Sequence, residues 1–106
     1  MDTLSRLEAA IAQRRAASPD SSYVAKLNAR GLPKICEKVG EEATETVIAA
    51  LSGSDKELTG EAADLVFHLM VLLGAKDIPL ADVLAELDRR EGTSGLEEKA
   101  ARKTEQ

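Results

Sequence analysis

Apolar side chains recur every three or four residues along most of this chain, which is the spacing of one face of an α-helix. Glycines and turn-forming residues interrupt this pattern and mark the helix ends. The predicted helices span about residues 3–17, 22–31, 33–51, 55–74 and 79–91. Ser94 and Glu97 have the spacing of a capping box, so a short terminal helix is predicted after Ser94. Residues 103–106 are predicted to be frayed and solvated.

The pattern predicts an all-α fold, a bundle of four to five helices in one domain that spans residues 1–106. The fourth helix is the unusual one, because the run from Leu65 to Leu73 is apolar all round except for His68. Such a helix is normally covered on most sides, which four or five helices of this length can hardly achieve. We therefore expect a homodimer to complete the bundle. The third helix has a predicted apolar face formed by Leu32, Ile35, Val39, Ala43, Val47 and Ala50.

Two acidic motifs lie on the third and fourth predicted helices. The first contains Glu41, Glu42 and Glu45, and the second contains Glu61 and Asp64. Residues three apart on a helix have Cβ atoms about 5–6 Å from each other, so Glu42 and Glu45 repel, as do Glu61 and Asp64. Convergence on a hard cation such as Mg²⁺ would make both pairs favourable. A solvated acidic face is the usual alternative, but the second pair lies in an otherwise apolar helix, which favours a metal site.

Composition and charge narrow the possible functions. The 106 residues are 43% hydrophobic and 31% charged, with a formal net charge of −5, which argues against binding to nucleic-acid backbones. We see no N-terminal signal pattern and no apolar run approaching the roughly 18 residues of a membrane span, and so expect a soluble cytoplasmic protein without a membrane partner. Cys36 is the single cysteine and is predicted to be a small buried apolar residue.

Phosphate binding would have to use basic side chains, because the sequence contains no glycine-loop motif. Basic residues recur every four positions before the acidic motif, at Lys26, Arg30, Lys34 and Lys38. Surface charge and phosphate binding explain this series equally well, and Lys26, Arg30 and Lys38 are the candidates for holding phosphate oxygens. His68, the only histidine, suits no nucleophilic triad beside so many carboxylates. It is expected at most to contact the metal ligands without binding the metal itself.

Four segments together resemble a known family: SYVAKLNARG (22–31), KICEKVGEEATE (34–45), EAADLVFHL (61–69) and SGLEEK (94–99). They closely resemble the phosphoribosyl-ATP pyrophosphohydrolases of histidine biosynthesis, which belong to the all-α nucleoside triphosphate pyrophosphatases of the MazG type. The resemblance covers nearly the whole chain. It implies hydrolysis of 1-(5-phosphoribosyl)-ATP to 1-(5-phosphoribosyl)-AMP and pyrophosphate, with Mg²⁺ as cofactor and Mn²⁺ as a substitute. It also implies a homodimer with sites near the subunit interface.

The residue roles follow from this resemblance together with the helical spacing. Glu42, Glu45, Glu61 and Asp64 are assigned as Mg²⁺ ligands. Glu41 is the candidate for orienting or deprotonating the attacking water, or for a further metal contact. A house-cleaning pyrophosphatase of the MazG or dCTPase type, acting on nucleoside triphosphates, would share every ligand. A non-catalytic helical interaction module with a solvated acidic stripe is the alternative outside enzymes.

Overall fold

The chain folds into α-helices joined by short connections. The structure, a computed structural model, describes residues 2–92 and 95–105, and within these ranges it has six α-helices and no strand. The helices are α1 (Thr3–Arg15), α2 (Tyr23–Arg30), α3 (Leu32–Ser52), α4 (Asp55–Ala75), α5 (Leu80–Arg90) and α6 (Gly95–Glu105). The predicted all-α class is confirmed. The terminal segment forms a sixth helix that includes residues 103–105, which were expected to be frayed, whereas the predicted cap at Ser94 lies outside the described residues.

Local capping explains where the helices that carry the acidic motifs begin. The Ser54 side chain accepts a hydrogen bond from the Glu57 backbone N–H, and the Glu57 side chain accepts one from the Ser54 backbone N–H. This reciprocal pair is a capping box, which satisfies N–H groups that an α-helix otherwise leaves without partners. Gly31 separates α2 from α3 with a φ of +95°, a conformation that favours glycine. Pro33 in the first turn of α3 costs no helical hydrogen bond.

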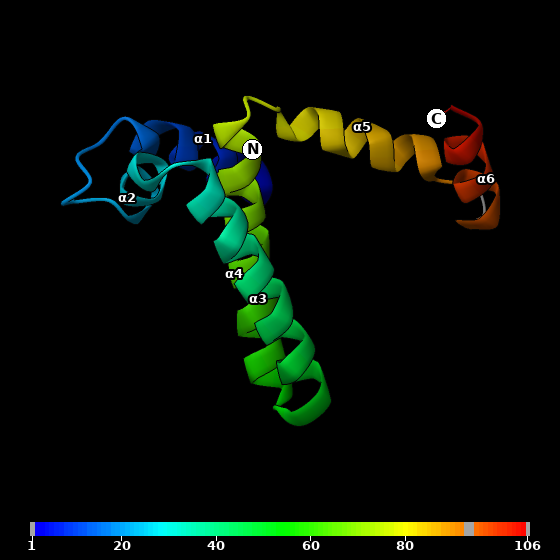
Figure 1. Cartoon of the computed structure of the whole chain (residues 1–106), viewed down its shortest axis with the longest axis horizontal. Coiled ribbons are helices and arrows are strands. Elements are labelled where there is room, and N and C mark those ends of the chain that lie inside the picture. Colours follow the sequence, from blue (N-terminus) through cyan, green and yellow to red (C-terminus); the bar gives the residue numbers. More distant parts are fainter. Residues whose placement is uncertain (1, 93–94, 106) are drawn as a thin grey trace.

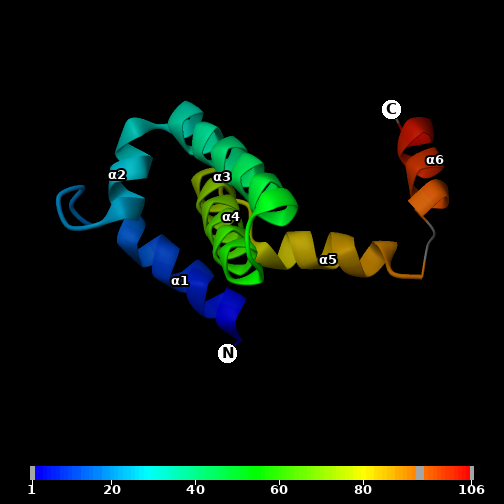
Figure 2. The same ribbon diagram turned by 90° about the horizontal axis from the view of Figure 1, so that it is seen from below.

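Helices α3 and α4 form a long antiparallel hairpin (Figure 1), and each of them carries one of the two acidic motifs. Seen from below, α1, α2 and α3 form an arc around α4 (Figure 2). The core between them is aliphatic and takes residues from five helices: Ile11, Val24, Leu27, Ile35, Met70, Val71 and Leu80. Ile35 is the most completely buried of the large side chains in the described chain, at 1% exposure. This core holds the first turns of α3 against the second half of α4.

Helix α5 leaves this body and runs outward, with α6 at its far end (Figures 1 and 2). Its first residue is anchored, because Leu80 is buried and its N–H donates to Glu8 Oε2 of α1 at 2.7 Å. Further along α5, Leu84 and Leu87 are exposed. The radius of gyration is 16.1 Å, whereas a compact domain of this length has about 13 Å. The single chain therefore leaves apolar surface uncovered.

The buried face of α3 differs from the predicted apolar face. Ile35, Glu42 and Ala49 are its buried residues, seven positions apart, whereas Val47 is 57% exposed. The prediction was wrong for Leu32, Val47 and Ala50, which are all exposed, because it assumed that every apolar side chain faces the core of its own chain. Cys36 is also exposed rather than buried, since it lies next to Ile35 and outside this face.

Judged by length and composition alone, helix α4 is long and apolar enough to cross a membrane. Its most apolar 18-residue segment has a mean hydropathy of 1.4, and 17% of that segment is buried inside the protein. The expectation that no segment approaches this criterion was wrong. One such helix is weak evidence, because core helices of soluble proteins pass the same test. Glu61, Asp64 and His68 also lie on α4, and ionisable groups are costly within a bilayer.

Candidate active site

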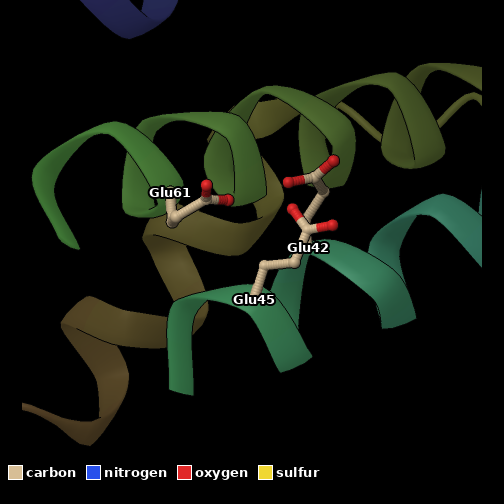
Figure 3. A group of neighbouring side chains, drawn as sticks. All are labelled: Glu42, Glu45 and Glu61. Atoms are coloured by element: carbon tan, nitrogen blue, oxygen red, sulfur yellow. The ribbon is translucent and has the colours of Figure 1, made fainter. Parts of the chain in front are cut away.

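Three carboxylates meet between α3 and α4. Glu42 and Glu45 of α3 and Glu61 of α4 each offer an oxygen, and these oxygens all lie within 4.8 Å of one another. The side chains point toward the same space between the two helices (Figure 3). The spacing of three residues puts Glu42 and Glu45 on one side of α3, and the short hairpin connection brings Glu61 opposite them. Three of the four predicted metal ligands are thus brought together.

Two oxygens of this group are buried without a partner. Glu42 is only 6% exposed, and neither Glu42 Oε2 nor Glu61 Oε2 has a hydrogen-bond partner within the part of the chain that the structure describes. A buried carboxylate oxygen without a partner is costly, and a bound cation would remove that cost. The donor set consists of carboxylate oxygens, the ligands that Mg²⁺ and Mn²⁺ prefer. The residues present therefore fit a hard divalent cation.

The electrostatics of the three carboxylates lead to the same conclusion. Burial, followed by the charge of Glu45, raises the pKa of Glu42 above its ordinary value. The pKa of Glu61 is also raised, first by a side-chain hydrogen bond with Glu45 and then by burial. Glu42 and Glu61 hold protons more tightly than isolated carboxylates because burial and the neighbouring carboxylates disfavour their ionised forms. A cation between them would stabilise the ionised forms.

Thr46 joins the two helices beside this group. Its hydroxyl lies 2.7 Å from the Glu42 carbonyl oxygen on its own helix and 3.2 Å from the Glu61 carbonyl oxygen on α4. These contacts help to fix the relative position of two of the carboxylate residues. The sequence analysis did not single out Thr46. A threonine in a helix commonly donates a hydrogen bond to the carbonyl oxygen four residues earlier, and this local bond does not indicate a contact with a second helix.

Asp64 and Glu41 are not part of the group of three. Asp64 is exposed, one turn after Glu61, although its charge contributes to the raised pKa values of Glu42 and Glu61, after the larger causes given above. Glu41 is exposed and pairs with Lys38, whose Nζ lies 3.2 Å from Glu41 Oε2. This hydrogen bond lowers the pKa of Glu41, which makes it a weaker base.

Of the three candidate phosphate-binding residues, Lys38 lies at the carboxylates. Its Nζ is 3.7 Å from Glu42 Oε1 in addition to its contact with Glu41. Lys26 and Arg30 are exposed on α2, and neither forms an ion pair within residues 2–92 and 95–105. The structure therefore brings one basic candidate to the carboxylates and leaves two on the surface of α2.

His68 is buried at 6% exposure and is hydrogen-bonded at both ring nitrogens. Its Nδ1 lies 2.7 Å from the Asp64 carbonyl oxygen, and its Nε2 lies 2.8 Å from the Tyr23 hydroxyl. Tyr23 comes from α2 and was missed by the sequence reasoning. No local pattern links residues 45 positions apart, so this contact could not be predicted from helical spacing.

A small hollow adjoins the carboxylates toward the turn between α3 and α4. It has a volume of about 200 Å³ and is lined by Glu45, Ile48, Ala49, Ser52, Gly53, Glu57 and Glu61. A larger cavity of about 530 Å³ lies between α1, the end of α4 and residues 77–80, and shares no lining residue with the carboxylate group. The hollow is acidic, so a phosphate group could enter it only together with cations.

An all-α fold that brings carboxylates of two paired helices together defines a class, the helical proteins with a candidate hard-cation site between helices. A sequence profile described as phosphoribosyl-ATP pyrophosphohydrolase matches residues 4–91, and the chain belongs to this family.

Curated relatives agree with this assignment over nearly their whole length. A protein of Erythrobacter litoralis named phosphoribosyl-ATP pyrophosphatase is 74% identical, and the match covers 96% of this chain and 98% of the relative. A protein of the same name from Novosphingobium aromaticivorans is 72% identical, with 95% of this chain and 94% of the relative covered. Another of the same name from Dinoroseobacter shibae is 58% identical, with 96% of this chain and 100% of the relative covered. The resemblance found in the sequence motifs is confirmed.

Proposed function

We propose that this chain hydrolyses 1-(5-phosphoribosyl)-ATP to 1-(5-phosphoribosyl)-AMP and pyrophosphate, the second step of histidine biosynthesis, with Mg²⁺ bound at the carboxylates between α3 and α4. The family and the relatives' names support the reaction. The observation that carries the site is the pair of buried oxygens, Glu42 Oε2 and Glu61 Oε2, which face the same space without a hydrogen-bond partner in the described chain. Mn²⁺ suits the same oxygens and should substitute.

The three clustered carboxylates would hold the cation. Glu42, Glu45 and Glu61 already lie within 4.8 Å of one another, so little rearrangement is needed to bind it. Asp64, exposed one turn from Glu61, is our fourth ligand and would turn toward the same space. A bound Mg²⁺ supplies charge neutralisation for the polyphosphate and a more acidic attacking water.

Glu41 would act on the attacking water from the edge of the site. Its lowered pKa keeps it ionised, so it suits accepting a hydrogen bond from the water better than removing its proton. Glu41→Gln should then reduce turnover much more than Mg²⁺ affinity, whereas Glu42→Gln should damage both. Mg²⁺ titration of both variants, followed by pyrophosphate release, separates these roles. Near wild-type turnover of Glu41→Gln would remove Glu41 from the mechanism, and rescue by excess Mg²⁺ would make it a ligand.

Basic side chains would hold the phosphate oxygens that the cation leaves free. Lys38 lies at the carboxylates, and its ammonium could exchange its contact with Glu41 for a phosphate oxygen. Lys26 and Arg30 lie four residues apart on α2 and so share one side of that helix. We propose that these three residues bind the substrate's phosphates.

A homodimer would cover the apolar surface that the single chain exposes. On α3, Val47 and Ile48 are each 57% exposed and Leu51 is 83% exposed, close to the carboxylates. The outward course of α5 and the large radius of gyration also leave room for a second chain. Light scattering at micromolar concentration should give at least twice the mass of one chain, and a monomer would contradict the proposal. A nucleotide substrate favours a cytoplasmic location, and no nucleic-acid or membrane partner is proposed.

Pyrophosphate release tests the proposed reaction. With Mg²⁺ present, phosphoribosyl-ATP should be hydrolysed faster than any of a panel of nucleoside triphosphates, and Glu61→Gln should abolish the activity. Glu37→Gln is the matched control, because Glu37 is exposed on α3 and pairs with Lys34 at 3.5 Å. Faster release from nucleoside triphosphates would favour the house-cleaning pyrophosphatase. No release from any substrate would favour the non-catalytic module.

A further inference from the structure

Tyr23 is held against α4 by contacts with Phe67 and His68. Its ring stacks on Phe67, with centroids 6.2 Å apart and planes at 25°, and meets the His68 ring at 85°. Its hydroxyl lies 2.8 Å from His68 Nε2. Although 46% of Tyr23 is exposed, Phe67 and His68 hold its ring and His68 Nε2 holds its hydroxyl.

The hydrogen bonds of His68 leave no free lone pair on its ring. The Asp64 carbonyl oxygen can only accept, so Nδ1, at 2.7 Å, carries the hydrogen of that bond. In a neutral imidazole the other nitrogen, Nε2, then carries the lone pair, and the Tyr23 hydroxyl donates to it. Nε2 is the atom through which His68 would bind a metal, and the Tyr23 hydroxyl occupies it.

His68 lies beside one of the proposed ligands of the cation site. It follows Asp64 by one helical turn and is buried. Its Nδ1 lies 2.7 Å from the carbonyl oxygen of Asp64, the proposed fourth ligand. The imidazole is therefore in direct contact with a residue of the proposed cation site.

The kind of ligand atom decides which cation such a site prefers. Carboxylate oxygens suit Mg²⁺ and Mn²⁺, whereas imidazole nitrogen suits Co²⁺, Ni²⁺ and Zn²⁺. One added imidazole would thus shift the preference toward the later transition metals. A magnesium enzyme gains selectivity if a nearby histidine is kept from binding the metal.

We propose that the Tyr23 hydroxyl keeps His68 out of the cation site and thereby determines the preference of this site for Mg²⁺ over Co²⁺ and similar metals. This inference rests on the proposed function, because it takes Glu42, Glu45 and Glu61 as the cation site. It assigns Tyr23 a role in metal selectivity rather than in the reaction itself.

Metal titration of Tyr23→Phe tests the proposal. The substitution keeps the ring that stacks on Phe67 and removes only the hydroxyl. All proteins should carry Cys36→Ser, because the exposed Cys36 thiol would itself bind Co²⁺. We expect the ratio of Co²⁺ affinity to Mg²⁺ affinity, measured by equilibrium dialysis, to rise roughly tenfold in Tyr23→Phe. The visible absorption of bound Co²⁺ should change as nitrogen replaces oxygen.

The second variant locates the source of the change. Adding His68→Gln to Tyr23→Phe should return the affinity ratio to within about twofold of the starting protein, because the nitrogen ligand is gone. A ratio that does not change in Tyr23→Phe, or that stays raised in the double variant, would overturn the inference while leaving the carboxylate site intact. A starting protein that binds neither Mg²⁺ nor Co²⁺ would instead overturn the proposed site and the inference together.

Discussion

Glu42→Gln tests the cation site most directly, because it replaces a buried carboxylate by an amide of the same shape. In the wild type, Oε2 of Glu42 is buried without a partner in the described chain, and burial and Glu45 raise its pKa. The ionised side chain therefore destabilises the metal-free fold. We expect metal-free Glu42→Gln to be at least as stable as the wild type near neutral pH. With Mg²⁺ present, the order should reverse.

The size of the reversal follows from mass action. At a Mg²⁺ concentration 100 times the Kd, binding adds about 2.7 kcal/mol to the free energy of unfolding. In a domain of this size each kcal/mol raises the Tm by about 4 °C, so the wild type should gain about 10 °C. Glu42 is one of three carboxylates within 4.8 Å. The loss of its charge should weaken Mg²⁺ binding by about tenfold to a hundredfold, which leaves a Tm gain of about 2–6 °C at the same Mg²⁺ concentration.

Thermal unfolding followed by circular dichroism, at one fixed protein concentration, measures these shifts. Glu37→Gln is the matched control, since it removes an exposed carboxylate from the same helix and should keep the full Mg²⁺ gain. A Glu42→Gln protein with the full wild-type gain would refute the assignment. So would a wild type whose Tm does not respond to Mg²⁺.

Three further predictions concern stability. Folding raises the pKa values of Glu42 and Glu61 above 4.5. The stability that comes from their protonation is therefore fully present below about pH 4.5 and is lost as the pH rises through the folded-state pKa values. Between pH 4.5 and 7 the Tm of the metal-free wild type should fall relative to the Tm of metal-free Glu42→Gln, and saturating Mg²⁺ should cancel this fall. Tm values of the two metal-free proteins that change in parallel with pH would contradict the prediction. Ile35→Ala, at the 1% exposed core position, should cost about 2–5 kcal/mol in urea unfolding, and a cost under about 1 kcal/mol would mean that the α2–α3–α4 packing is wrong. Thr46→Val should cost about 1 kcal/mol in the same assay and Thr46→Ser much less, because only serine keeps the hydroxyl between the helices; equal costs would exclude the hydrogen bonds as the cause.

Local signals in the sequence were sufficient for the helices and for most of the carboxylate group. Glycines and capping residues mark helix ends through short-range hydrogen bonds, so α1 to α5 were predicted to within about two residues. The convergence of Glu42, Glu45 and Glu61 was predicted because the helical spacing places Glu42 and Glu45 on one side of α3, and the short connection to α4 brings Glu61 opposite them.

What the sequence could not show depends on contacts between distant elements. The exposure of Val47 and Cys36 depends on which surfaces cover α3, and periodicity does not contain that information. The contact between Tyr23 and His68 depends on how α2 lies across α4. Asp64 has the right spacing, but it stays exposed outside the group because spacing does not determine side-chain direction.

The hydrogen bond from the Leu80 N–H to Glu8 Oε2 ties the start of α5 to the first helix across 72 positions of sequence. Pro79, the residue before α5, has no polar side chain with which to cap the helix, so the cap comes from α1. Closing a loop of this length costs chain entropy, which the contact has to offset. The direction in which α5 leaves the body therefore depends on a side chain of the first helix, and a change at Glu8 would be felt at the other end of the chain.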